Sequence, residues 1–240
     1  MNTIKYLKST VFNAPVQTIV NTVNCFGVMG AGLALEFKLR YPDLFADYVK
    51  KCQNKEVQIG KPYVYRISDD KKILNFPTKY HWRNPSKIPW IEAGLKYFNS
   101  HYHDWGITSI AFPKLGAGKG GLDWNDVRKI MEDYLCRIDI SVFICLDEAE
   151  AEGDERKMLE LIKADNFIEL IEQKTINKRQ KEAILKGPPL TRFGDLLKIP
   201  GLGKKSYEKI FHYYYWKATG SKELTNGSFS GNQLKLNFQV

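Results

Sequence analysis

The sequence predicts an α/β domain, with a largely parallel sheet between helices, followed by a small helical appendage. Two observations predict the α/β domain. Short apolar runs bounded by turn residues recur along the first 150 residues, and stretches with apolar residues three and four apart lie between them. Such alternation of strands and helices is typical of a parallel sheet that is covered on both faces. A basic, glycine-interrupted segment after residue 172 predicts the appendage.

Five strands and four helices are expected in the first domain. The strand-like runs cover residues 18–23, 62–67, 72–76, 109–112 and 140–145. The helical stretches cover residues 32–38, 43–51, 88–102 and 125–135, with Asp43 and Asn125 as expected N-caps. A last amphipathic helix over residues 151–172 is expected to complete a domain of residues 1–172.

The composition indicates a globular protein without a membrane segment. Of the 240 residues, 43% are hydrophobic, which is enough to bury a core. No apolar run approaches the ~20 residues that cross a bilayer, and the N-terminal residues show no cleavable leader. We therefore expect a cytoplasmic protein with no membrane partner. The four cysteines have neither CxxC nor other metal-ligand spacing, so reduced thiols and no metal site are expected.

The formal net charge of +9 is concentrated near the C-terminus. Residues 1–150 carry 20 basic and 16 acidic side chains, residues 151–172 carry 3 and 7, and residues 173–240 carry 13 and 4. A basic region of this kind suits a polyanion such as nucleic acid, because neutralised phosphates release counterions. A basic face that is only solvated also accounts for the pattern.

Two glycine-rich loops follow predicted strands. The first runs from Asn24 to Gly32 and the second from Pro113 to Gly121. Ligands of parallel sheets bind beyond the carboxyl ends of the strands, where glycine lets the backbone approach a phosphate. Two such loops at one edge could hold a diphosphate from both sides. The second loop also fits GxGxxG, but that signal alone is weak and a dinucleotide site usually lies in the first βαβ unit; no P-loop motif is present.

Four blocks in the same order resemble the macrodomains of DNA ADP-ribosyl glycohydrolases. These are the DarG antitoxins of DarT–DarG toxin pairs, and they resemble the eukaryotic terminal ADP-ribose protein glycohydrolases. The blocks are residues 21–24, residues 27–34, the Asn-Phe-Pro-Thr-Lys-Tyr-His-Trp segment at 75–82, and residues 113–124.

The resemblance implies a macrodomain, with a mixed and largely parallel sheet, in a bacterial cytoplasmic enzyme that needs no cofactor. The enzyme would remove ADP-ribose from DNA bases modified by a DarT-like toxin. Asn24 would contact the distal ribose, and Lys79 would be catalytic because the family's essential lysine stands in the same Phe-Pro-Thr-Lys setting. A lysine with a lowered pKa can act as nucleophile or electrostatic catalyst at an anomeric carbon. The other ADP-ribose contacts would come from Thr10, Val11, Asn21, Gly27, Val28, Met29, Gly30, Ala31, Gly32, Leu33, Thr78, Pro113, Leu115, Gly116, Ala117, Gly118, Lys119, Gly120 and Gly121.

The chain departs from the family pattern at two positions. Macrodomains usually carry an early Asp that binds the adenine amino group, but the register set by Asn21 places Thr10 there. The eukaryotic relatives carry an Asp in the second loop, where this chain has Gly120. The Gly-Gly-Leu-Asp-Trp pattern at residues 120–124 matches DarG instead, which favours a DNA substrate over a protein substrate.

Aromatic and cationic residues directly follow Lys79. Tyr80, His81, Trp82 and Arg83 could stack on and orient an extruded base, for which single-stranded DNA is the simplest substrate. Packing of the loop by Tyr80 and Trp82 explains the same residues equally well.

Residues 197–206 resemble a helix-hairpin-helix, the motif by which many repair proteins hold the DNA backbone without reading its sequence. Gly201 and Gly203 would keep the hairpin small and expose backbone N–H groups to a phosphate, while Lys204 and Lys205 add charge. A helical turn that contacts a protein partner is the alternative. On this interpretation residues 173–219 form a basic helical region.

Residues 220–240 are predicted to form a flexible tail. The tail contains Gln233–Phe238, which resembles the Gln-x-x-Leu-x-Phe peptide that binds bacterial sliding clamps; a final β-strand is equally consistent with its alternating apolar residues.

Three functional hypotheses follow from these patterns. The first is a DNA ADP-ribosyl glycohydrolase that acts through Lys79. The second is a non-catalytic module that binds ADP-ribose and is tethered to DNA or to a toxin. The third is an enzyme that acts on O-acetyl-ADP-ribose or on protein-linked ADP-ribose.

Overall fold

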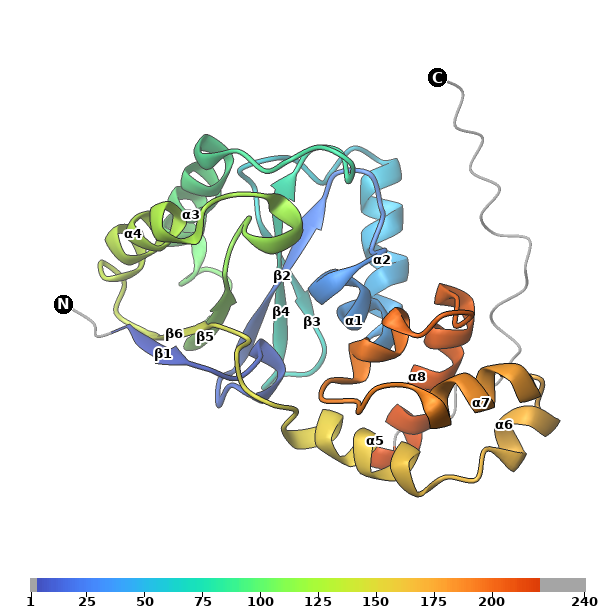
Figure 1. The fold of residues 1–240 in the computed structure, drawn as a ribbon. Helices are drawn as coiled ribbons and strands as arrows, with labels where there is room; N and C mark the ends of the chain where they lie inside the picture. The colour runs from blue at the N-terminus through green and yellow to red at the C-terminus, as the bar shows by residue number, and fades with distance from the viewer. Residues whose placement is uncertain (1–3, 221–240) are drawn as a thin grey trace. The chain divides into compact units, whose positions relative to one another are not determined.

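The computed structural model describes residues 4–220, which form two compact units (Figure 1). The N-terminal unit ends at Glu152, and the C-terminal unit begins at Gly153. The sequence places this division after residue 172 instead. In the structure, the helix that follows Gly153 packs against the last helix of the chain, so it belongs to the C-terminal unit.

A six-stranded sheet forms the centre of the N-terminal unit, in the order β1-β6-β5-β2-β4-β3. All neighbouring pairs are parallel except β3 and β4. The mixed, largely parallel sheet is therefore confirmed. The strands are β1 (Lys5–Leu7), β2 (Thr18–Asn24), β3 (Tyr63–Arg66), β4 (Lys72–Lys79), β5 (Ser109–Pro113) and β6 (Ser141–Cys145).

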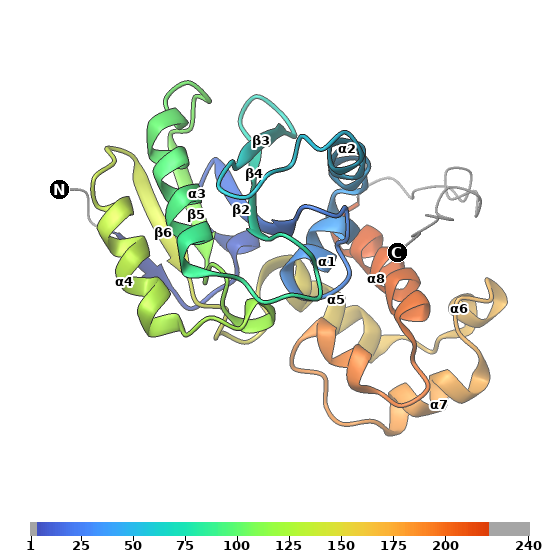
Figure 2. The same cartoon turned by 90° about the horizontal axis from the view of Figure 1, so that it is seen from above.

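The helices of the N-terminal unit cover both faces of this sheet, and Figure 2 shows α3 and α4 on one side with α1 and α2 on the other. Val20 and Leu74 face the first pair, whereas Ile19 and Ile73 face the other side, because successive side chains of a strand alternate. Both faces are thus buried, as the near-continuous apolar runs predict. The helices are α1 (Gly32–Arg40), α2 (Pro42–Gln53), α3 (Ile88–His101) and α4 (Trp124–Leu135), with short 3-10 helices η1 (Val11–Asn13) and η2 (Gly118–Gly120).

The C-terminal unit consists of helices: α5 (Gly153–Ala164), α6 (Ile168–Glu172), α7 (Lys178–Lys186), η3 (Phe193–Lys198) and α8 (Lys204–Thr219). The single helix expected over residues 151–172 is wrong. The chain turns between α5 and α6 because Phe167 adopts a φ of 61°, and its N–H donates to Oδ1 of Asp165 at 2.6 Å. The turn buries the Phe167 ring, which is 1% exposed.

One buried ion pair joins α5 to η3. Glu155 is 8% exposed, and its carboxylate accepts from Nε of Arg192 at 2.9 Å and from the backbone N–H of Phe193 at 2.8 Å. Nearby, Phe193 packs edge-on against Phe211. Within residues 4–220, no helix is long and apolar enough to cross a membrane. The predicted clamp-binding peptide Gln233–Phe238 lies outside the described residues.

Candidate functional site

The strand order brings three loops to one edge of the sheet. Strands β5, β2 and β4 are adjacent and parallel, so their carboxyl ends coincide (Figure 1). The loops that follow them are the first loop (residues 25–31, after β2), the middle loop (residues 80–87, after β4) and the second loop (residues 114–123, after β5). A register shift at the end of the β2–β4 pairing places Asn24 opposite Lys79. The two residues predicted to act on the ribose therefore end neighbouring strands.

Asn24 holds the first loop in shape. Its side chain is 6% exposed; Nδ2 donates to the carbonyl of Val28 at 2.6 Å, and Oδ1 accepts from the N–H of Phe26 at 2.9 Å. The turn also requires Gly27, whose φ is 77°. The loop then runs through the extended Ala31 into α1, so backbone N–H groups at the start of that helix form the far end of the loop.

The second loop is built from glycines at positive φ. Gly116, Gly118 and Gly121 have φ values of 66°, 57° and 79°, which place the loop in a conformation that other residues rarely adopt. Gly120 is buried, and Ser86 of the middle loop donates its N–H to the Gly120 carbonyl at 2.8 Å. A Cβ at position 120 would lie 2.7 Å from the Ser86 Oγ. The middle and second loops are therefore in contact.

The first and second loops also approach each other. A Cβ built on Gly32 would lie 3.8 Å from Cγ of Lys119. Between positions 24 and 32 and between positions 113 and 123, the exposed residues are Ala31, Gly32, Gly118, Lys119, Gly121 and Asp123. A diphosphate held between the loops would meet backbone N–H groups and the ammonium group of Lys119.

Lys79 ends β4 between these loops. Its Nζ donates to the carbonyl of Lys119 and lies 3.5 Å from the carbonyl of Trp82. Burial, together with the positive charge of Lys119, lowers the pKa of Lys79. Within residues 4–220 no carboxylate forms an ion pair with Lys79 to oppose this shift. A larger fraction of Lys79 is therefore free amine at neutral pH than for an ordinary surface lysine.

The segment after Lys79 packs on the first loop and still exposes two rings. Phe26 contacts Tyr80 edge-on, with ring centroids 5.4 Å apart, and contacts His81 at 4.6 Å. The guanidinium of Arg83 lies 4.6 Å from the centre of the Trp82 ring. Tyr80 remains 56% exposed and Trp82 41% exposed. Phe26 is not among the predicted site residues, although its place between Asn24 and Gly27 is a signal in the sequence; no such signal marks Ser86.

Several residues predicted to bind ADP-ribose are fully covered in the structure. Asn21 is 0% exposed, and its Nδ2 donates to Oδ1 of Asn75 at 2.9 Å across the β2–β4 pair. Val11 packs in the core with Ile19 of β2 and Ala111 of β5, whereas the half-buried Thr10 is the N-cap residue of η1, which contacts both of these strands. The other covered positions are Met29, Thr78, Leu115, Gly116 and Gly120, while Gly27, Val28, Gly30, Leu33, Pro113 and Ala117 are partly exposed.

Cys25, the thiol of the first loop, is not arranged as a nucleophile. Burial raises its pKa to about 11, which keeps the thiol protonated at neutral pH. Among the residues that the structure describes, no group of three or more His, Cys, Asp or Glu side chains could hold a metal ion.

The fold and the loops define a macrodomain, and comparison with known proteins agrees. The Macro domain family matches residues 20–131. The macrodomain of Mycobacterium tuberculosis DarG is 43% identical, with a TM-score of 0.58, over 60% of this chain and 98% of that chain. The chain therefore belongs to the macrodomain family.

Within that family the similarity is to the DarG type. The structure of Thermosipho africanus DarTG in complex with ADP-ribose is 37% identical, with a TM-score of 0.59, over 64% of this chain and 44% of that chain. The DNA ADP-ribosyl glycohydrolase of Mycobacterium tuberculosis is 48% identical over 129 residues, which are 52% of this chain. The match covers only 37–38% of the length of the curated relatives from Mycobacterium tuberculosis and Thermus aquaticus.

Proposed function

We propose that the N-terminal unit binds ADP-ribose and hydrolyses the bond that joins it to a DNA base. The observation that carries the proposal is Lys79, a lysine of lowered pKa placed between two glycine loops at the end of β4. The relatives support the substrate, since they are named DNA ADP-ribosyl glycohydrolases and one related structure holds ADP-ribose.

The chemistry follows from the position of Lys79. As the bond to the base breaks, the anomeric carbon of the distal ribose becomes oxocarbenium-like. The free amine of Lys79 can bond to that carbon while the base departs with the bonding electrons; water then displaces the lysine and yields ADP-ribose. In an electrostatic role the amine stabilises the transition state without a covalent bond. The carbonyls of Lys119 and Trp82 orient Nζ in either case.

Two surfaces support a DNA substrate. Tyr80 and Trp82 are exposed beside Lys79 and could stack on the modified base of a single strand. The hairpin that contains Gly201, Gly203, Lys204 and Lys205 could hold the backbone, since all four residues are exposed. We also propose that the protein is an antitoxin, which repairs the DNA that a DarT-like toxin modifies in a bacterial cytoplasm. A related Thermosipho africanus protein is named as a fusion of a DNA ADP-ribosyl transferase with the glycohydrolase.

The test is release of ADP-ribose from an ADP-ribosylated single-stranded oligonucleotide. The wild type is expected to release it, and Lys79→Ala is expected to lose at least 100-fold in rate while it still binds free ADP-ribose, since a positioned catalytic group commonly supplies ~10²–10⁴-fold. Lys96→Ala, at an exposed position on α3, is the matched control. Equal rates for wild type and Lys79→Ala would reject the assignment.

A panel of substrates separates the alternatives. The same enzymes are offered ADP-ribosylated DNA, a protein carrying ADP-ribose on carboxylates, and O-acetyl-ADP-ribose. Faster turnover of the modified protein or of O-acetyl-ADP-ribose than of the modified DNA would show that DNA is not the preferred substrate. Tight binding of ADP-ribose with no turnover of any substrate would show that the protein is a non-catalytic module that binds ADP-ribose.

A further inference from the structure

The C-terminal unit contains two copies of one sequence pattern, 26 residues apart. Residues 167–186 and 193–212 align without a gap. Conservative pairs include Glu169 with Asp195 and Ile176 with Leu202. The identical pairs are Phe167 and Phe193, Leu170 and Leu196, Lys178 and Lys204, Glu182 and Glu208, and Ile184 and Ile210.

Both copies build the same local structure. Each has a short helix, a tight turn and a longer helix: α6 and α7 in the first copy, η3 and α8 in the second. The turn contains a left-handed residue, Lys174 with φ 54° or Gly201 with φ 83°, and the aligned residues Asn177 and Gly203 are the N-caps. The left-handed residue comes one position earlier in the first copy. The buried positions coincide: Phe167 and Phe193, Leu170 and Leu196, Ile176 and Leu202 are each at most 4% exposed. Residues 167–186 therefore also form a hairpin, although they lack the two glycines that mark the hairpin of residues 193–212.

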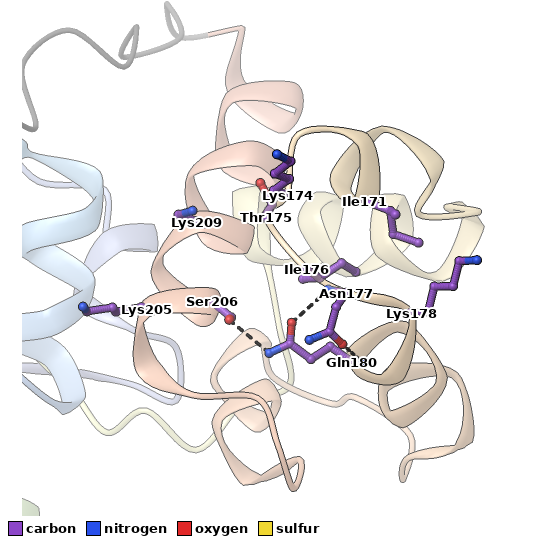
Figure 3. A pocket seen from close by; sticks show the side chains of 10 residues that line it. All are labelled: Ile171, Lys174, Thr175, Ile176, Asn177, Lys178, Gln180, Lys205, Ser206 and Lys209. Carbon is purple, nitrogen blue, oxygen red and sulfur yellow. Dashed lines mark hydrogen bonds between the residues drawn. The ribbon is translucent and has the colours of Figure 1, made fainter.

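Equivalent residues of the two copies touch each other. Gln180 and Ser206 are each the third residue of the longer helix, and the Gln180 Nε2 donates to the Ser206 Oγ at 3.2 Å (Figure 3). It also donates to the carbonyl of Gly201 at 3.0 Å. Equivalent residues meet where two copies are related by an approximate two-fold rotation, whereas simple translation keeps them one repeat apart. The contact between Gln180 and Ser206 is the one expected if the two hairpins form a two-fold-like pair.

An open pocket of about 560 Å³ is lined by residues of both copies (Figure 3). Lys174 and Lys178 come from the first copy, and Lys205 and Lys209 come from the second. All four side chains are exposed, and within residues 4–220 none of them forms an ion pair. This distinguishes them from neighbouring Lys204, which pairs with Glu208 at 3.9 Å.

The chemistry of the lining selects a phosphate ligand. Besides the four lysines, the pocket presents the hydroxyl and amide groups of Thr175, Asn177, Gln180 and Ser206, with neither an acidic nor an aromatic side chain. Ammonium, amide and hydroxyl donors suit phosphate oxygens. Sites for single strands rely on aromatic rings that stack on bases, and this pocket has none.

We propose that the two hairpins together form a site for the sugar-phosphate backbone of double-stranded DNA. A two-fold-like pair of hairpins matches the antiparallel strands of a duplex, as two-fold symmetric proteins match symmetric DNA sites. The proposal extends the DNA-binding role of the Gly201–Lys205 hairpin to residues 174–180 and sets the ligand as a duplex. It rests on that role and is independent of catalysis by Lys79. The C-terminal unit would hold duplex DNA while the macrodomain acts on an unpaired, modified base.

The experiment measures binding of the full chain to an unmodified 20-base-pair duplex, by fluorescence anisotropy between 50 and 200 mM salt. Two variants neutralise one copy each: Lys174→Gln with Lys178→Gln, and Lys205→Gln with Lys209→Gln. The control, Lys157→Gln with Lys163→Gln, removes the same charge from exposed positions of α5 that do not line the pocket. Melting temperatures confirm that the variants fold, and Lys174→Arg with Lys178→Arg is expected to retain binding.

Each neutralised phosphate contact contributes about 0.9 to the slope of log affinity against log salt. Each pocket variant is therefore expected to lose about 1.8 of that slope, which means that its affinity falls about 12-fold less than that of the wild type over the fourfold rise in salt. At 50 mM salt both pocket variants are expected to bind the duplex more weakly than the control does.

Three results would overturn the proposal. If the first-copy variant binds like the control while the second-copy variant is weakened, a single hairpin holds DNA and the paired site is rejected. If both bind like the control, neither hairpin holds DNA. Tighter binding to a single strand of the same sequence than to the duplex would reject the duplex. Release of ADP-ribose by the same variants, measured in parallel, shows separately whether the macrodomain is active.

Discussion

The close contact between the middle and second loops allows a direct test of the site geometry. Gly120 has no positive φ, so its backbone tolerates an alanine. A Cβ there would lie 2.7 Å from the Ser86 Oγ and 3.4 Å from the Ser86 Cβ. Ser86 is 4% exposed, so it has little room to move away. Gly120→Ala should therefore push the second loop outward.

The expected free-energy cost of Gly120→Ala follows from overpacking of the space next to Ser86. Insertion of one methyl group into a filled space typically costs about 1–3 kcal/mol. If that cost is relieved by displacement of η2, the ligand-binding form becomes less stable by the same amount, and ADP-ribose affinity falls about 5–150-fold. Because the Lys119 carbonyl holds Nζ of Lys79, the rate of ADP-ribose release should fall as well.

A second substitution isolates the cause. The Ser86 Oγ is buried without a hydrogen-bond partner among the described residues, so Ser86→Ala should be neutral or slightly stabilising. In the double variant, Gly120→Ala with Ser86→Ala, the nearest atom to the new methyl group is the Cβ at 3.4 Å, which is close to an ordinary contact. The double variant should recover most of the lost affinity, as a strong coupling in a double-mutant cycle.

The assay is titration calorimetry with ADP-ribose, together with thermal unfolding of all four proteins. Wild-type affinity in Gly120→Ala would show that the second loop does not need the close approach to Ser86. A double variant as weak as the single variant would show that the loss has a cause other than this contact.

Three further predictions concern charge. If Lys79 acts as a free amine, the rate of ADP-ribose release rises with pH through the lowered pKa of Lys79. Lys119→Gln removes one cause of that lowering, so the midpoint of the pH–rate profile should move to higher pH. An unmoved midpoint would contradict the assignment. Glu155→Ala should destabilise the C-terminal unit by about 3 kcal/mol in denaturant unfolding, because it removes the buried carboxylate that accepts from the Arg192 guanidinium and from the Phe193 N–H; a loss below 1 kcal/mol would show that the pair contributes little. Burial would raise the pKa of Asp195, but the hydrogen bonds that it accepts outweigh burial and lower the pKa from 3.8 to about 2. Its stabilising contribution is therefore present above about pH 4 and lost as the pH falls toward 2, so Asp195→Asn should flatten the acid-induced decline of the melting temperature in that range, and an unchanged decline would refute the link.

Much of the macrodomain was predictable because its determinants are local. The apolar runs of β2 and β4 are continuous since both faces of these central strands are buried, and the glycine loops are recognisable because positive φ values favour glycine. The three-residue β1 was missed because only one of its residues is even partly buried. The turn at Phe167 was missed because a large aromatic residue is a rare choice for a left-handed position.

The repeat in the C-terminal unit was present in the sequence but obscured. The second copy is marked by Gly201 and Gly203, whereas the first copy has Thr175 and Asn177 at the aligned positions. Only the matched burial and the contact between Gln180 and Ser206 show that the two segments form one paired structure.

The sequence by itself determined the class of the N-terminal unit, the two glycine loops and Lys79 as the candidate catalyst, because periodicity, turn residues and short motifs act over a few residues. The tertiary structure decided which of these residues meet. Lys79 and Lys119 are 40 positions apart, and their contact depends on the order β5-β2-β4. The burial of Asn21 against Asn75 depends on the same order. Strand order results from packing of the whole chain, so no local pattern contains it.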